Sequence, residues 1–279
     1  MAKGYSLHIG INHIDPVHYN GEDGKLNSCI NDAKAMQNIA QLNHYQSIVL
    51  LDEQATREEV KKQILQIAKK MSSDDIFLLT YSGHGSRLMD VGITDEEDYY
   101  DETWVLYDGQ LLDDELWNLW SYFPENARIL AFLDACHSAT GMRFWTPDES
   151  ENENEENVPL PEKALSDIVA KETFENNKEF YTDIVKELPK KPKDVNCSII
   201  SIAGCEDNQT SRAGFFPWSL SLFTAKLVKV WDNGKFSDNY EKFHQEIVNK
   251  MPNLNDQNPA IRFLGKKNPK FVSDKPFII

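Results

Sequence analysis

The first half of the chain alternates short apolar runs with amphipathic segments, and this alternation restricts the folds it can adopt. Apolar runs predict buried strands at 7–11, 47–51, 76–81 and 128–133. Apolar residues recur at helical spacing in the segments 28–42, 56–71 and 112–122. Strands joined through helices form a mostly parallel sheet with right-handed crossovers and helices on its faces. The pattern therefore predicts an α/β fold.

The character of the sequence changes between residues 145 and 196. Residues 148–157 contain no apolar side chain and carry charge of one sign, which predicts a solvated segment. Residues 164–188 have loose helical spacing and are followed by the basic stretch 189–193. We interpret this region as an insertion or linker with some helix. Regular structure is predicted to resume with a strand at 197–203, helices at 217–231 and 238–250, and a strand at 261–264.

The charge balance excludes some classes of partner. The chain has 29 Lys and Arg against 45 Asp and Glu, a net charge of −16, so a nucleic-acid partner is not expected. An acidic surface instead attracts basic peptide segments, although six of the acids lie in the short tract 148–157. No signal peptide or membrane span is evident, and four cysteines without an export signal indicate reduced thiols. These features predict a cytoplasmic protein.

Two reactive side chains follow directly after predicted strands. His84 lies in Ser82-Gly83-His84-Gly85, and Cys136 lies in Asp134-Ala135-Cys136. Ligands of parallel sheets bind beyond the carboxyl ends of the strands, so both side chains are expected at one edge. Taken singly, such a Cys is usually a small buried hydrophobe, and such a His is usually a turn residue. The first motif also lacks the Lys-Ser/Thr ending of a phosphate loop.

Together, these motifs resemble the metacaspase branch of the caspase superfamily. The two catalytic motifs of that family resemble residues 81–86 and 134–138, and His84 precedes Cys136 by about 50 residues, as in caspase-type enzymes. Residues 10–12 with 29–33 resemble its first strand and helix, and 202–211 resemble the strand that opens its small-subunit half. The resemblance implies a caspase-like three-layer sandwich in which helices flank a mostly parallel central sheet. It also implies one peptidase domain, 1–279, divided into a large-subunit-like part, the insertion and a small-subunit-like part at 1–145, 146–196 and 197–279.

The resemblance also implies the roles of a cysteine endopeptidase. Cys136 would form the acyl-enzyme, His84 would assist proton transfer to the leaving amine, and the N–H groups of Gly85 and Cys136 would hold the oxyanion. His137 is a rival base. Because it neighbours Cys136 in sequence, its side chain should point away, and a structural role is the better prediction.

The family places two acids in the pocket for the residue before the scissile bond. The matching positions are Asp32 and Asp134, with Cys29 and Ser82 beside them. Two carboxylates suit a guanidinium, tolerate an ammonium and repel an acid, so cleavage of protein or peptide substrates after Arg or Lys is expected. Without the resemblance, a local hydrogen bond for Asp32 and a turn cap for Asp134 would be the simpler interpretations.

A second acidic group resembles the calcium site of many metacaspases. Asp101, Asp113 and Asp114 fit the matching positions, and hard cations prefer several carboxylate oxygens. Arg143 stands about where the family has a further acid. Two interpretations stay open: a calcium site, or a solvated acidic loop followed by a helix N-terminus. No cofactor is expected to be required.

The insertion lies where relatives of this family are processed, so the chain is expected to be a zymogen. Cleavage is predicted within 144–196, by the protein itself or by an activating protease, and Lys190, Lys191 and Lys193 suit a basic preference. The alternative function is a catalytically silent caspase-fold pseudo-protease or regulatory binding partner. An asparaginyl-type peptidase is less favoured because of Asp32 and Asp134.

Overall fold

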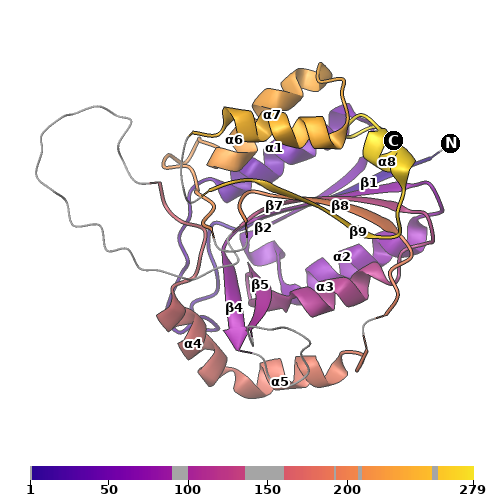
Figure 1. Ribbon diagram of the computed structural model, residues 1–279. Coiled ribbons are helices and arrows are strands. Elements are labelled where there is room, and N and C mark those ends of the chain that lie inside the picture. The colour runs from indigo at the N-terminus through magenta and orange to yellow at the C-terminus, as the bar shows by residue number, and fades with distance from the viewer. Residues whose placement is uncertain (1, 90–99, 136–159, 192, 207–208, 253–256) are drawn as a thin grey trace, which may run out of the picture.

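A six-stranded sheet runs through the middle of the computed structural model, and helices cover both of its faces (Figure 1). The structure describes residues 2–89, 100–135, 160–191, 193–206, 209–252 and 257–279. The strand order is β2-β1-β3-β7-β8-β9, and only the edge strand β9 runs antiparallel to its neighbour. The bounds are β1 Gly4–Gly10, β2 Gln46–Leu51, β3 Ile76–Ser82, β7 Arg128–Asp134, β8 Ser198–Ala203 and β9 Ala260–Gly265. The predicted α/β fold with a mostly parallel sheet is confirmed.

The two faces of the sheet carry different helices. In Figure 1, α1, α6 and α7 lie above the sheet, and α2 and α3 lie below it. Alternate residues of β3 serve the two layers: Phe77 and Leu79 pack toward α2 and α3, while Ile76 and Leu78 pack toward α1, α6 and α7. A strand buried on both faces needs a continuous apolar run, which is how the sequence revealed it. The helices are α1 Cys29–Leu42, α2 Arg57–Lys70, α3 Asp113–Trp120, α6 Leu222–Trp231, α7 Tyr240–Lys250 and α8 Pro269–Ser273.

Helix α2 shows how local sequence sets an element. The Thr56 side chain accepts a hydrogen bond from the Glu59 N–H at 3.2 Å and so caps the helix. Glu59 does not complete a capping box with Thr56. Instead, the Glu59 carboxylate accepts from Lys62 Nζ at 2.7 Å and from Gln63 Nε2 at 2.6 Å, one turn further along the helix.

The segment expected to be an acidic loop after His84 contains three strands. They form an antiparallel sheet in the order β4-β5-β6, with β4 Gly85–Met89, β5 Tyr100–Leu106 and β6 Gly109–Leu112. Trp104 and Val105 are buried in the main core, so tertiary packing stabilises this small sheet despite its acidic sequence.

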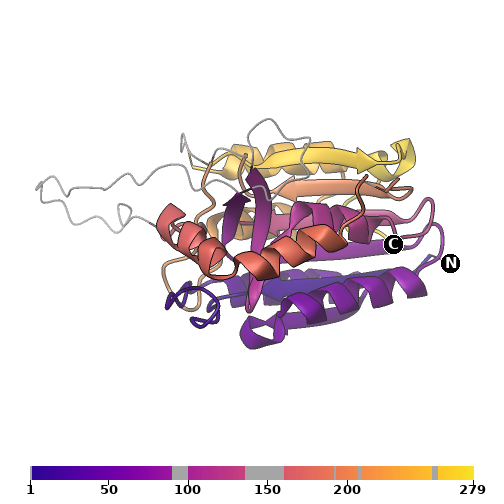
Figure 2. The ribbon, with the colours of Figure 1, turned by 90° about the horizontal axis from the view of Figure 1, so that it is seen from below.

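The linker region contains two separate helices, α4 Asp167–Asn176 and α5 Lys178–Glu187. Tyr181 of α5 is fully buried against Leu88 and Leu112 of the small sheet. In Figure 2 the pair crosses in front of the strands of the small sheet. These contacts join the linker region to the small sheet.

Two further observations concern the chain as a whole. Among the described residues, no helix is both long enough and apolar enough to cross a membrane. The described cysteines Cys29, Cys197 and Cys205 are buried free thiols.

The parallel register brings three strand ends to one level. Gly10 of β1 pairs with Ser82 of β3, and Ser82 pairs with Asp134 of β7. The residues that follow these strands therefore emerge side by side at the carboxyl edge of the sheet.

His8 of β1 makes a testable contribution to acid sensitivity. Its Nδ1 lies 2.9 Å from Thr80 Oγ1, and burial lowers its pKa to about 3. Between about pH 6.5 and 3 the unfolded chain therefore binds a proton at His8 that the native chain does not bind. The contribution of neutral His8 to the free energy of unfolding is thus fully present above pH 6.5 and is lost as the pH falls toward 3. We expect His8→Gln to flatten the fall in unfolding free energy between pH 6.5 and 4 by up to about 1.4 kcal/mol per pH unit.

Urea unfolding at a series of pH values measures this difference. The control is His13→Gln, which alters an exposed histidine whose side chain is 48% accessible. Identical pH profiles for the wild type and His8→Gln would contradict the assignment.

Candidate active site

His84 lies in the turn that connects β3 to β4 at the carboxyl edge of the sheet. Its side chain is buried, and Nε2 lies 2.9 Å from the carbonyl oxygen of Gly24. A carbonyl oxygen only accepts, so Nε2 carries the proton and Nδ1 of the neutral ring is left as a base. No described residue forms a hydrogen bond with Nδ1. Burial lowers the pKa of His84 to about 4, and the nearby Lys163 ammonium acts in the same direction.

Two glycines hold this geometry. Gly24 has a φ of +56°, and a Cβ at this position would lie 2.7 Å from Ile14 Cδ1, so only glycine presents its carbonyl to His84 without strain. At Gly83 a Cβ would lie 2.6 Å from the Tyr81 hydroxyl, which donates to the carbonyl oxygen of His84 at 2.6 Å. The imidazole is therefore positioned by backbone groups on both sides.

Cys136, the expected nucleophile, lies outside the described residues, as does its neighbour His137. The last described residues before it are Asp134, at the end of β7, and buried Ala135.

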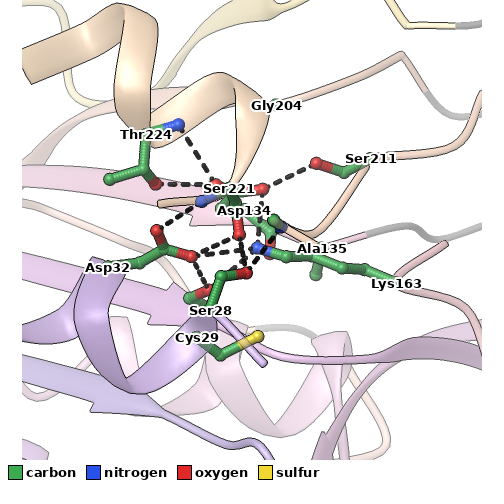
Figure 3. Close-up of polar contacts among 12 residues, drawn as sticks. Ser28, Cys29, Asp32, Asp134, Ala135, Lys163, Gly204, Ser211, Ser221 and Thr224 are labelled. Atoms are coloured by element: carbon green, nitrogen blue, oxygen red, sulfur yellow. Dashed lines mark hydrogen bonds and ion pairs between the residues drawn. The ribbon is translucent and has the colours of Figure 1, made fainter. Parts of the chain in front are cut away.

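The two acids of the expected pocket meet a buried lysine. Lys163 Nζ lies 2.9 Å from Asp134 Oδ1 and 3.3 Å from Asp32 Oδ2, and it also contacts Ser82 Oγ at 2.8 Å (Figure 3). Lys163 has no exposed surface, and both acids are at least 97% buried. We call Asp32, Asp134 and Lys163 the charge cluster.

Hydroxyl groups from the last part of the chain complete the charge cluster. Asp32 accepts hydrogen bonds from the N–H of Ser221 at 2.8 Å and from its hydroxyl. Asp134 accepts from Ser211 Oγ and from Thr224 Oγ1, both at 2.6 Å. Both acids therefore bond to residues that are far away in sequence. These bonds differ from the local hydrogen bond and the turn cap that were the simpler interpretations for Asp32 and Asp134. The expected helix at 217–231 begins five residues late, at Leu222, because the backbone before it turns toward Asp32.

The surroundings set the protonation of the charge cluster. Burial alone would lower the pKa of Lys163, but the carboxylates of Asp134 and Asp32 outweigh it and hold this pKa above its ordinary value. Burial raises the pKa of Cys29 to about 12, so this thiol beside Asp32 stays protonated. Cys29 therefore lines the site and does not act as a nucleophile.

Lys163 belongs to a segment whose backbone is bonded into the site. We call residues 161–165 the Lys163 segment. The Gly85 N–H donates to the Lys163 carbonyl oxygen at 2.9 Å, and the Gly85 carbonyl accepts from the Leu165 N–H at 3.1 Å. On the other edge, the Lys163 N–H donates to the carbonyl oxygen of Ser211 at 2.9 Å.

Lys163, Ser211, Ser221 and Thr224 were not singled out as site residues from the sequence. Ser211 lies in the stretch 202–211 that resembles the family, and this was the only local signal available for the four.

The acidic group expected to bind calcium lies elsewhere. Asp113 and Asp114 open α3 at the rim of a hollow of about 460 Å³, and none of the residues lining it belongs to the charge cluster. The Asp101 side chain and Arg143 lie outside the described part. Within the described ranges, no three His, Cys, Asp or Glu side chains gather as a metal site.

The arrangement of sheet, histidine turn and acidic pocket defines a caspase-fold protein. The structure aligns with caspase-1 from Spodoptera frugiperda with a TM-score of 0.57 and 13% identity, over 94% of this chain and 86% of that one. A family model described as "Caspase domain" matches residues 3–276. The chain belongs to the caspase domain family.

Individual relatives agree with this assignment. Metacaspase-1 from Mycosarcoma maydis is 29% identical over 241 residues, which is 76% of this chain and 58% of the relative. Metacaspase-1 from Schizosaccharomyces pombe is 27% identical over 93% of this chain and 68% of the relative. The resemblance to metacaspases is therefore confirmed. Several of the curated relatives are much longer, and the chain spans about half of their length.

A crystal structure of protein GSU0716 from Geobacter sulfurreducens is also similar. It has 38% identity and a TM-score of 0.86, with 99% of both chains aligned. The similarity extends over nearly the whole length of both chains.

The charge cluster yields a stability prediction. Asp32→Asn leaves the buried Lys163 ammonium with one carboxylate, and breaking a buried pair in this way is expected to lower the free energy of unfolding by about 3 kcal/mol. The matched control is Asp183→Asn, which removes an exposed i,i+3 ion pair with Lys186 and should change it by less than about 0.5 kcal/mol. Urea unfolding followed by tryptophan fluorescence measures both. Equal losses in the two variants would show that the buried pair is not coupled to folding.

Proposed function

We propose that this protein is a cysteine endopeptidase that cleaves peptide bonds after Lys or Arg. The observation that carries the proposal is the buried contact of Lys163 with Asp32 and Asp134, because it supplies an example of a basic side chain bound at this site. An acidic side chain in the same place would face two carboxylates and would be repelled.

The proposed dyad divides the chemistry between two residues. Cys136 would be the nucleophile, and Nδ1 of His84 would take its proton and later deliver it to the leaving amine. The hydrogen bond from Nε2 to the Gly24 carbonyl supports this assignment, since it leaves Nδ1 as the base. The Gly85 N–H, which already donates to a carbonyl oxygen, would stabilise the oxyanion together with the N–H of Cys136.

The same pocket is expected to accept both basic side chains. Ammonium binding uses Ser82 Oγ and the Asp134 carbonyl oxygen, at 2.8 and 3.0 Å, besides the two carboxylates. A guanidinium offers five donors and binds carboxylates in bidentate fashion, so Arg should bind at least as well as Lys. The net charge of −16 would favour the approach of basic protein or peptide substrates.

Peptide hydrolysis tests the function directly. Fluorogenic peptides whose last residue is Arg, Lys, Asp or Asn are incubated with the wild type and with Cys136→Ala, with and without calcium. We expect hydrolysis after Arg and Lys by the wild type alone. The calcium arm tests the proposed role of Asp101, Asp113 and Asp114.

The outcomes separate the alternatives. Hydrolysis after Asp would remove the specificity proposal while leaving the nucleophile. Absence of hydrolysis in every arm, including chains cut in the linker by an added protease, would favour the silent pseudo-protease.

A hydroxyl of the pocket should affect binding more than chemistry. Ser221→Ala removes the hydroxyl that donates to Asp32 but keeps the backbone N–H bond. Loss of one hydrogen bond to a charged group is expected to raise KM for Lys and Arg peptides about tenfold, with little change in kcat. Steady-state kinetics measure the two constants, and the control is Ser219→Ala, which removes a hydroxyl that donates to the Phe216 carbonyl oxygen and not to the charge cluster. A fall in kcat at constant KM would place Ser221 in the chemical step instead.

A further inference from the structure

The loop whose carbonyl group bonds to His84 is held by the linker helices. We call residues 15–24 the Gly24 loop. His18 Nε2 of this loop lies 2.7 Å from the hydroxyl oxygen of Tyr181 in α5. The carbonyl oxygen of His18 accepts a hydrogen bond from Asn177 Nδ2, at the joint between α4 and α5, at 3.1 Å. One residue of the loop therefore bonds to the linker through both its side chain and its backbone.

The Tyr181 hydroxyl is the buried part of this contact. The side chain is fully buried, and its oxygen accepts a hydrogen bond from the Gln110 N–H of β6 at 3.2 Å. Burial raises the pKa of Tyr181 to about 12, so the phenol keeps its proton and can donate it to His18 Nε2. An exposed hydrogen bond from Asn20 Nδ2 to Glu172 of α4 adds to the contact. A buried polar group that loses its partner is costly, so the Tyr181 contact is expected to restrain the loop most.

The Gly24 loop is bonded within itself, so a restraint near its middle reaches its end. The Glu22 N–H donates to the Tyr19 carbonyl oxygen at 3.0 Å, and the Glu22 side chain accepts from the Gly24 N–H at 3.3 Å. Tyr19 is buried, and its hydroxyl donates to the Leu106 carbonyl oxygen at 2.6 Å. These bonds connect the residue that follows His18 with the carbonyl group of Gly24.

The same linker also bonds to the other side of the histidine turn. The Leu165 N–H donates to the Gly85 carbonyl oxygen at 3.1 Å, and the next residue, Ser166, caps α4 with its side chain. His84 directly precedes Gly85, and its ring bonds to Gly24. The linker therefore contacts the backbone on both sides of the imidazole.

The Gly24 carbonyl determines which ring nitrogen of His84 carries the proton. A neutral imidazole has one N–H, and an acceptor beside Nε2 places the proton there. No described residue forms a hydrogen bond with Nδ1. If the carbonyl moved away, no described acceptor would favour one nitrogen over the other, and part of the protein would lose the free Nδ1.

We propose that the contact between Tyr181 of α5 and His18 positions His84, by holding the Gly24 loop where its carbonyl keeps the ring proton on Nε2. The catalytic benefit of this positioning rests on the proposed function, in which Nδ1 of His84 is the base. Tyr181 and His18 are thus positioning residues that act through Gly24. The linker helices support the histidine, in addition to joining the segment that carries Lys163.

The test observes the tautomer of His84 directly. The full chain is labelled with ¹⁵N in its histidine rings, and His84→Gln identifies the His84 signals by their loss. At pH 7.5, where His84 is neutral, we expect the wild type to show a ring protonated on Nε2. Tyr181→Phe removes only the hydroxyl and should give signals averaged between the two tautomers. Tyr122→Phe, at a tyrosine that is 52% exposed, is the matched control and should match the wild type.

A second variant breaks the same bond from the loop side. His18→Phe keeps an aromatic ring beside Tyr19 and Tyr181 but lacks Nε2, so it should shift the tautomer as Tyr181→Phe does. The double variant should resemble either single one, because both remove one interaction. If Tyr181→Phe does not fold, His18→Phe decides alone. Additive shifts, or unchanged His84 signals in the folded variants, would overturn the inference.

Peptide hydrolysis separates this inference from the proposed function. In Tyr181→Phe, kcat for Lys and Arg peptides should fall by up to about a hundredfold at constant KM, because the base is misplaced while the charge cluster is intact. An altered tautomer in a protein that hydrolyses no peptide would support the positioning and remove the proposed function. Normal hydrolysis beside an unchanged tautomer would do the reverse. A fall in KM at constant kcat would assign α5 to retaining Lys163 in the charge cluster and overturn its role at His84.

Discussion

The carboxyl edge of the central sheet depends on a buried charge cluster, one ammonium between two carboxylates. Removing three charges from water is costly, and their mutual attraction compensates only when the remaining hydrogen-bonding capacity is satisfied. Serine and threonine groups from α6 and the loop before it donate these hydrogen bonds to the two carboxylates. Such a cluster adds little net stability compared with an apolar core, and recognition of a basic side chain is the role that we propose for it. The lysine that now fills the site is part of the same chain.

The parallel register of β1, β3 and β7 makes the charge cluster geometrically possible. Ser82 and Asp134 are register partners, so their side chains belong to one level of the sheet edge. Asp32 reaches that level from α1, and the small sheet β4-β5-β6 carries Gly85 beside it. The linker closes the arrangement, because α5 packs on the small sheet while the Lys163 segment runs between Gly85 and Ser211. The site is thus shared among segments that are remote in sequence.

Much of the framework was predictable because its signals are local. A strand buried on both faces needs a continuous apolar run, and β3 and β7 were found on that basis. The proximity of Asp32 and Asp134 was also anticipated, through family resemblance. The small sheet was missed because acidic residues interrupt its apolar pattern, and its stability comes from burial of residues such as Trp104. The late start of α6 was missed because Ser221 is held by Asp32 and not by its own helix.

By itself, the sequence determined the fold class and the family, because these depend on apolar periodicity and on short contiguous motifs. Through family resemblance it also predicted that Asp32 and Asp134 lie together. The tertiary structure alone decided which basic side chain lies between these two acids. Lys163, Lys190, Lys191 and Lys193 all lie in the linker region, and packing distinguishes Lys163, which is buried between two carboxylates, from the other three, which are exposed. The physical reason is that the pairing energy of a buried charge depends on partners brought together by folding, here 131 and 29 residues away along the chain.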